Sequence, residues 1–267
     1  NINPTDVTIT DCTFIGNSTL YIGGAVETKN ATFTRCIFAG NRSIGDYNAA
    51  GAVFSYSIVA FNNCTFTNNH ADLGSALFFE GTAYMTNCIF WGSEDQISTS
   101  FGGQYPFVNY SNIQGGWTWP GDGNIDADPC FVDPGYWADA DDPNIITEPN
   151  DPNAVWIDGD YHLKSQEGRF DPNSRSWVID DVTSPCIDAG DPNTPVSYEP
   201  EPNGGIVNMG AYGGTAEASR SYPVWSVNKT VWVVLLSVAL LAGLSIAFYA
   251  KEKRAKAMLT QDRTQIT

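Results

Sequence analysis

The sequence predicts an all-β protein: a right-handed parallel β-helix (solenoid) with a β-rich C-terminal cap and one C-terminal transmembrane helix. Three observations predict this architecture. A short motif recurs four times, apolar residues alternate within each repeat, and a charge-free run lies near the C-terminus. A fixed period near 25 residues is typical of solenoids, whose repeats bury their apolar faces by stacking on their neighbours.

Each repeat ends in a Cys-x-Phe motif. The four copies lie at residues 12–14, 36–38, 64–66 and 88–90. In the first three copies an asparagine stands three residues after the phenylalanine, at Asn17, Asn41 and Asn69. Neighbouring strands lie about 4.8 Å apart, so equivalent residues of successive turns stack in ladders. We therefore expect the cysteines and phenylalanines to fill the interior and the asparagines to stack at a corner.

Apolar residues alternate upstream of each cysteine, as Val7 and Ile9 do in the first repeat. This period of two predicts strands. The alternation slips by one residue just before the cysteine, and Arg35, Asn62–Asn63 and Asn87 occupy the slip. Such residues are typical of tight bends, so we predict two strands joined by a bend and then a third short strand in each turn. About four to six turns fit residues 1–134.

A second phrase, Gly-Gly-Ala-Val at residues 23–26, recurs as Ala-Gly-Ala-Val at 50–53 and more loosely at 74–77. Together with Phe-x-x-Asn, it resembles the polymorphic outer-membrane protein repeat, a surface β-helix repeat. The resemblance covers about the first third of the chain and implies a surface location. The right-handed turn follows from this family and from the general preference of parallel crossovers. The fourth copy departs from the pattern at Ser93, which indicates that the regular solenoid ends there.

The chain after the solenoid divides into five segments. They are an acidic, Pro-rich loop without regular structure (135–154), a capping module (155–218), a linker (219–230), a transmembrane helix (231–250) and a basic cytoplasmic tail (251–267). In the module, phrases at residues 160–163, 184–191 and 208–214 resemble the terminal module of choice-of-anchor Q surface proteins. This resemblance implies a protein anchored at the cell surface. We expect the module to cover the last open turn of the solenoid, as solenoid ends require.

Residues 231–250 carry no charge and would span about 30 Å as a helix, which matches a bilayer core. Lys251, Lys253 and Arg254 follow at once, so the positive-inside rule places the C-terminus in the cytoplasm. The sequence thus predicts a single-pass cell-membrane protein whose N-terminal region lies outside. Because the chain begins at Asn1, close to a strand, we also expect further turns upstream.

Charge and cysteine content exclude several classes of function. The formal net charge of −17 opposes binding to nucleic acid or anionic lipid. It also opposes acidic polysaccharides unless a metal intervenes. Four of the six cysteines belong to the ladder, where free cysteine packs as a small apolar residue. Cys130 and Cys186 are left, and whether they pair stays open; no spacing suggests zinc.

Two groups of residues are candidate binding sites. Asp122, Asn124, Asp126 and Asp128 alternate as oxygen ligands do in a calcium loop, although Ala127 stands where such a loop needs glycine. Asx-type turns that close a turn of the solenoid are the alternative. Calcium is the one cofactor that the sequence offers.

Trp117, Trp119 and Trp137 form the second group, a platform on which sugar rings would stack. The alternative is that these rings fold back as apolar cover for the solenoid.

We therefore expect a membrane-anchored surface protein for recognition, adhesion or scaffolding that contacts a polysaccharide or a surface protein, with no catalytic residue in this segment. The alternative is a polysaccharide lyase or glycoside hydrolase whose site lies in upstream turns or in the Trp117–Asp128 loop. A lyase needs basic residues beside the substrate, whereas Lys29, Arg35 and Arg42 fall at different points of the turn. A third interpretation is a stalk that holds an upstream domain away from the membrane.

Overall fold

A computed structural model describes residues 7–46, 48–93, 95–100 and 103–222, which belong to one compact unit. These residues form strands β1 to β20, turns and loops, and contain no helix. Accordingly, none of the described segments is a helix that could cross a membrane. The predicted transmembrane helix at 231–250 and the basic tail lie outside the described residues.

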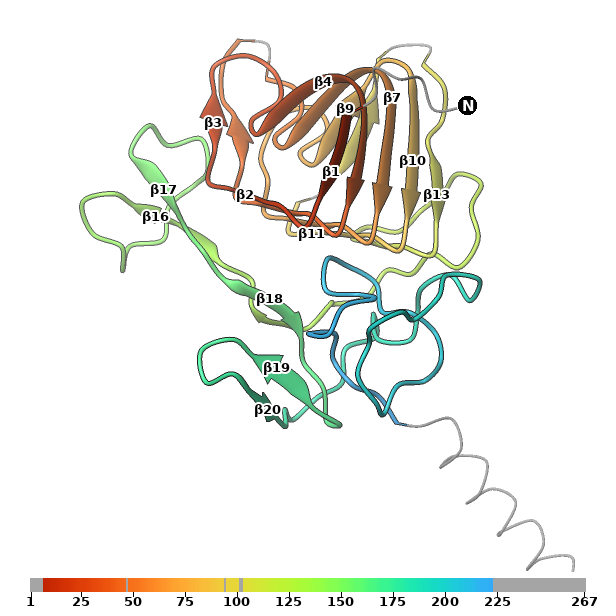
Figure 1. Cartoon of the computed structure of the whole chain (residues 1–267). Helices are drawn as coiled ribbons and strands as arrows, with labels where there is room; N and C mark the ends of the chain where they lie inside the picture. Colours follow the sequence, from red (N-terminus) through yellow and green to blue (C-terminus); the bar gives the residue numbers. More distant parts are fainter. Residues whose placement is uncertain (1–6, 47, 94, 101–102, 223–267) are drawn as a thin grey trace, which may run out of the picture. The chain divides into compact units, whose positions relative to one another are not determined.

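Two parallel sheets form the main walls of a β-helix of about four turns (Figure 1). The first sheet runs in the order β1 (Val7–Thr10), β4 (Val26–Thr34), β7 (Val53–Asn62), β10 (Thr82–Thr86) and β13 (Phe107–Asn109), with β9 (Leu77–Phe79) beside β7 and β12 (Ile97–Thr99) beside β9. The second sheet contains β2 (Thr13–Ile15), β5 (Ile37–Ala39), β8 (Thr65–Thr67), β11 (Ile89–Trp91) and β14 (Asn112–Ile113), and β3 (Ser18–Thr19) pairs with β6 (Arg42–Ser43). Each strand pairs with its equivalent one repeat later, as Phe33 does with Phe61. The predicted solenoid is confirmed.

The interior contains the predicted ladders. Phe14, Phe38, Phe66 and Phe90 stack with ring centroids 4.8, 4.6 and 4.8 Å apart. Cys36, Cys64 and Cys88 are fully buried beside them as free thiols, while Cys12 of the first turn is exposed. Stacked aromatic rings at this spacing add to the stabilisation from burial alone.

The polar corners also follow the sequence. Asn17 Nδ2 donates to Asn41 Oδ1 at 2.9 Å, and Asn41 Nδ2 donates to Asn69 Oδ1 at 2.9 Å, which confirms the asparagine ladder. Arg35, Asn63 and Asn87 have φ of 50°, 50° and 58°. This left-handed conformation turns the chain sharply between the first and second sheets, and asparagine tolerates it better than most residues do. The predicted bends are confirmed.

After the solenoid, the strands pair in antiparallel fashion. They are β15 (Phe131–Asp133) with β18 (Asp160–Leu163), β16 (Tyr136–Asp139) with β17 (Ala154–Ile157), and β19 (Arg169–Asp171) with β20 (Ser176–Val178). The expectation that residues 135–154 lack regular structure is therefore wrong for β16. Its Trp137 and Ala138 are buried, and this apolar content holds the segment as a strand. Residues 179–222 continue as turns without a strand, and we call residues 131–222 the C-terminal module.

The C-terminal module packs along a flank of the solenoid, which differs from the expected cover over its last turn. Ile37, Ala39 and Ile89 point outward from the second sheet and pack with Leu163 and Met209 of the module. Both faces of this sheet are therefore buried, one by the phenylalanine ladder and the other by the module. In two turns, the residue between Cys and Phe of the repeat motif is an isoleucine, Ile37 or Ile89. This position points outward from the sheet, and the module covers it.

The end of the solenoid is closed by residues 114–126 instead. Ile113 N donates to Ile125 O at 2.9 Å and Ile125 N donates to Ser111 O at 2.9 Å, so Ile125 adds one last partial turn. Trp117 packs against the main core. The alternative interpretation, in which an aromatic ring covers the solenoid, therefore holds for Trp117.

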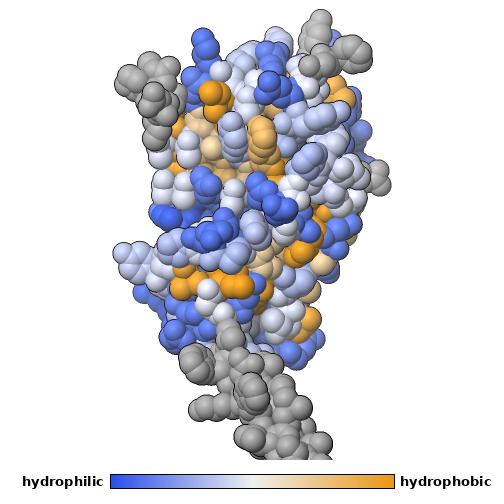
Figure 2. Space-filling model, turned by 90° about the vertical axis from the view of Figure 1, so that its right-hand side faces the viewer, coloured by the Kyte–Doolittle hydropathy of each residue, from blue (hydrophilic) through white to orange (hydrophobic). Residues whose placement is uncertain are grey.

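The outer surface mixes apolar and hydrophilic side chains. Figure 2 shows one face on which several apolar patches are separated by hydrophilic residues. On the outer face of the first sheet, Tyr84 and Phe107 stack with ring centroids 5.1 Å apart, and both are about half exposed. Small separate patches of this kind are normal on soluble domains.

Candidate functional site

An aromatic cleft lies at the closed end of the solenoid. It is a hollow of about 160 Å³ between residues 95–97 and the loop at 113–119. The rings of Trp117 and Trp119 meet edge to face with centroids 5.0 Å apart, and the ring centroid of Tyr105 also lies 5.0 Å from that of Trp119. The structure thus brings two of the three predicted tryptophans together and adds a tyrosine.

The two tryptophans differ in what they contact. Trp117 Nε1 donates to Pro120 O at 3.4 Å, and its ring is packed on the core, so it has a structural role. Trp119, which is half-buried like Trp117, is not part of the core cluster, and Tyr105 beside it, at the margin of the cleft, is 62% exposed. Gly115 and Gly116, with φ of 87° and 82°, make the turn that carries both tryptophans over the end of the solenoid. Trp119 and Tyr105 are therefore the rings that a ligand would reach.

Polar groups line the other side of the cleft. The Asp95 carboxylate accepts hydrogen bonds from Gly74 N at 3.0 Å and from Ser98 Oγ at 2.8 Å. Gln96 is buried and donates to Ser93 O, while Gln114 Oε1 accepts from Gly92 N at 2.6 Å. The fold already satisfies most of these groups. The cleft offers ring stacking and a few amide donors, which suits binding better than acid–base chemistry.

Trp137 is not part of this cleft. It lies on β16 against the flank of the solenoid, only 8% exposed, and its Nε1 donates to Asn68 O at 3.3 Å. The ring packs edge to face on Trp156 and below the guanidinium of Arg42, which is 5.0 Å from its centroid. Its contacts are those of a core residue, so the predicted platform of three tryptophans does not form.

The four residues of the predicted calcium loop make hydrogen bonds within the last turn. Asn124 Oδ1 accepts from Ser111 N and its Nδ2 donates to Val108 O, so both ends of this amide are bonded to the fold. Asp126 and Asp128 each accept a backbone N–H, from Gly115 and Cys130, and Asp122 N donates to Asn109 Oδ1. The bond from Cys130 N to Asp128 Oδ1 is an Asx-type turn, as in the alternative. The other bonds join this segment to residues 108–115 of the preceding turn. Within the ranges that the structure covers, no three His, Cys, Asp or Glu side chains are placed to hold a metal. Calcium binding stays a prediction, which the melting temperature in a calcium titration would test.

Cys130 and Cys186 are both free thiols. Cys186 is fully buried, accepts a hydrogen bond from Asn112 Nδ2 at 3.1 Å, and has its pKa raised to about 12 because burial disfavours the thiolate. A thiol this buried is unreactive, so its role is packing between the module and the last turn.

Sequence reasoning missed a buried cluster of ionisable side chains in the C-terminal module. His162 Nδ1 lies 2.5 Å from Asp160 Oδ1, and its ring stacks on Tyr212 with centroids 3.6 Å apart. Burial raises the pKa of the Asp160 carboxyl, but the contacts to His162 and Arg169 outweigh it and leave the pKa lowered. Asp160 and His162 belong to the phrase at residues 160–163, but Arg169 and Tyr212 join them only when the module folds, so the sequence alone did not indicate the cluster.

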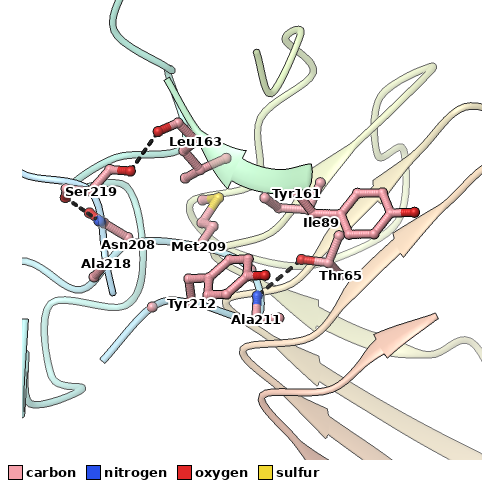
Figure 3. A pocket seen from close by; sticks show the side chains of 12 residues that line it. Thr65, Ile89, Tyr161, Leu163, Asn208, Met209, Ala211, Tyr212, Ala218 and Ser219 are labelled. Atoms are coloured by element: carbon pink, nitrogen blue, oxygen red, sulfur yellow. Dashed lines mark hydrogen bonds between the residues drawn. The ribbon is translucent and has the colours of Figure 1, made fainter. Parts of the chain in front are cut away.

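The hollow where the module meets the solenoid is a packing seam. Figure 3 shows Ala211 N donating to Thr65 Oγ1 of β8, with Met209 and Tyr212 beside Ile89 and Tyr161. The free space is about 10 Å³, which has room for one water molecule at most. This seam therefore holds the module in place and binds no organic ligand.

Comparison with known families gives one match. Residues 143–190 match the model of a family described as "Disaggregatase related". The matched stretch starts in the predicted acidic loop, contains β17 to β20 and ends in the Ser-Pro-Cys-Ile-Asp-Ala-Gly phrase. No curated protein and no solved structure matches the chain. The chain is therefore a β-helix protein with one segment similar to disaggregatase-related proteins.

Proposed function

We propose that this chain is a membrane-anchored cell-surface β-helix protein for recognition, adhesion or scaffolding, and that it binds glycans at the aromatic cleft. The observation that carries the proposal is the pair of accessible rings, Trp119 and Tyr105, beside a polar hollow. Sugar rings present an apolar face that stacks on aromatic side chains, while their hydroxyls need amide and carboxylate partners. The cleft offers both kinds of contact.

The surface location is supported by the resemblance of the repeats and of the C-terminal module to surface proteins. The membrane anchor is supported by the charge-free run at 231–250 and the basic residues that follow it. Deletion of residues 231–267 is expected to move the protein from the membrane fraction to the soluble fraction. Retention in the membrane fraction would contradict the anchor.

The glycan proposal is tested with Trp119→Ala. The full chain, in a detergent without sugar headgroups, is titrated calorimetrically with uncharged and acidic polysaccharide fragments. Because one stacked ring contributes about 0.5–1.5 kcal/mol, we expect the substitution to weaken binding about three- to tenfold. Trp137→Phe is the matched control, since that ring is buried on the flank away from the cleft. Equal binding by wild type and Trp119→Ala would contradict the proposal.

A second candidate is a polysaccharide-degrading enzyme, a lyase or a glycoside hydrolase. The match of residues 143–190 to a family described as "Disaggregatase related" favours it, because that description has the form of an enzyme name. The same fragments, sized after incubation with the full chain, distinguish the two functions. Shortened products would support the enzyme, whereas retention without shortening would support recognition.

A further inference from the structure

A groove runs along the junction between the bends of the solenoid and the C-terminal module. It consists of three hollows of about 350, 370 and 310 Å³, all bordered by Arg35. The first two share Asp11 and Thr215, and the second and third share Ser197 and Gly214, so the three adjoin. We call this feature the Arg35 groove. Each hollow has the size of a small-molecule site, and the row suits an extended ligand.

One wall of the groove is the ladder of bends between the two sheets. Thr34, Asn62 and Thr86 line it on successive turns and lie in register across the first sheet. Within the described ranges their side chains make no hydrogen bond to other protein groups. Asn63 and Asn87, next to them, are occupied, because their amides donate to Asn208 O and to Thr194 Oγ1. The wall therefore presents a row of available hydroxyl and amide groups on rigid backbone.

The opposite wall comes from residues 194–198 and 213–217 of the module. Tyr198 lies on it and is 81% exposed. The buried Glu199 carboxylate accepts hydrogen bonds from Gly214 N and Asn208 N, both at 2.8 Å, and so ties the two loops together. The buried Glu199 carboxylate thus anchors the backbone next to Tyr198, whose ring is exposed.

The charges in the groove nearly cancel. Arg35 Nε and Nη2 donate to the two carboxylate oxygens of Asp11 at 2.6 and 2.8 Å. This bond lowers the pKa of Asp11 and raises that of Arg35, so both groups stay ionised. Glu217 at one end adds a negative charge. Among the described residues, Arg35 is the one cation that borders the groove, and it is already paired, which disfavours an anionic ligand. The remaining N–H groups and lone pairs of Arg35 and Asp11 suit hydroxyl groups.

We propose that the Arg35 groove binds an uncharged oligosaccharide several units long. The ligand class follows from the row of hydroxyl and amide groups, the exposed tyrosine ring and the balanced charge. A β-strand of a partner protein fits poorly, because the backbone of the bends is already bonded from turn to turn, as Arg35 N is to Asn62 O. The groove shares no residue with the aromatic cleft, so this site goes beyond the proposed function and stands without it.

The test uses the full chain carrying Trp119→Ala, which leaves the groove as the intact site. Hexamers of uncharged glucan, mannan, galactan and chitin, and of acidic galacturonan, are titrated calorimetrically. We expect at least one uncharged hexamer to bind. Adding Tyr198→Ala is expected to weaken the binding of that hexamer about three- to tenfold, and adding Asn62→Ala is expected to weaken it about two- to fivefold. Both side chains are exposed, so neither change disturbs folding.

Tyr21→Ala in the same background is the matched control, because Tyr21 is 71% exposed and borders none of the three hollows. It is expected to bind like its parent. The proposal is overturned if no uncharged hexamer binds, if Tyr198→Ala and Asn62→Ala leave binding unchanged, or if the acidic hexamer binds as tightly. The reverse background, Tyr198→Ala with Trp119 intact, tests the aromatic cleft separately, so the two sites can fail independently.

Discussion

At the scale of single residues, Glu199 links the stability of the fold to pH. Its Oε1 accepts two backbone N–H groups, but its Oε2 is buried without a partner. Burial raises the pKa of this carboxyl to about 7, although the two N–H bonds oppose the rise. The same residue joins the two loops that form one wall of the Arg35 groove. Its protonation is thus linked to the stability of that wall.

The free energy of unfolding should depend on pH through Glu199. The folded carboxyl holds its proton more tightly than the unfolded one, whose ordinary pKa is 4.5. Stability from this group is therefore greatest below the unfolded pKa and falls as pH rises to about 7, by roughly 3 kcal/mol in all. Glu199→Gln keeps an oxygen acceptor and is expected to remove this component. Urea unfolding between pH 4 and 8 measures it.

The exposed Glu201→Gln is the matched control for this measurement, and its pH profile should follow the wild type. If Glu199→Gln also followed the wild type from pH 4 to 8, the raised pKa of Glu199 would be refuted.

At the scale of elements, the solenoid is stabilised by ladders whose members are unequal. Asn41, in the middle of its ladder, is fully buried and donates to Asn69 Oδ1 and to Phe14 O. Asn17, at the end of the ladder, is exposed. A buried hydrogen-bonding group that loses its partner costs far more than one that water can reach.

Asn41→Ala is expected to lower the free energy of unfolding by about 2–4 kcal/mol. The substitution removes the amide that donates to the carbonyl of Phe14, and it leaves the buried Asn69 Oδ1 with only the backbone N–H of residue 41. Asn17→Ala should cost less than about 1 kcal/mol, since water replaces the lost bond. Chemical denaturation of both variants makes the comparison. If the two variants lost similar amounts of unfolding free energy, burial would not determine how much each asparagine of the ladder contributes to stability.

At the scale of the whole molecule, the solenoid and the C-terminal module share one apolar cluster. Ile37 and Ile89 belong to the solenoid, and Leu163 and Met209 belong to the module. Bonds such as Asn63 Nδ2 to Asn208 O join the same two parts. Because each part covers apolar surface of the other, neither has a complete core alone.

Unfolding of the described unit is therefore expected to be one cooperative transition. Ile89→Ala should destabilise both parts together by about 2–5 kcal/mol, since it opens a cavity in the shared cluster. Ile58→Ala, on the exposed outer face of the first sheet, should cost less than about 0.5 kcal/mol. Hydrogen exchange measured along the chain tests this. Loss of protection confined to the module in Ile89→Ala would contradict the shared core.

The sequence by itself determined the turns of the solenoid, because side chains one period apart must stack when strands pair in parallel. It placed the phenylalanine, cysteine and asparagine ladders, and it located the bends at Arg35, Asn63 and Asn87. Only the tertiary structure decided which residues that are far apart in the sequence lie close together. It separated Trp137 from Trp119, laid the C-terminal module along the flank, and brought Tyr198 and Asn62 into adjoining hollows of one groove. The physical reason is that the repeat specifies contacts between neighbouring turns. The docking of the module depends instead on outward side chains such as Ile37 and Ile89, which pack with residues such as Met209 that lie far along the chain and follow no period.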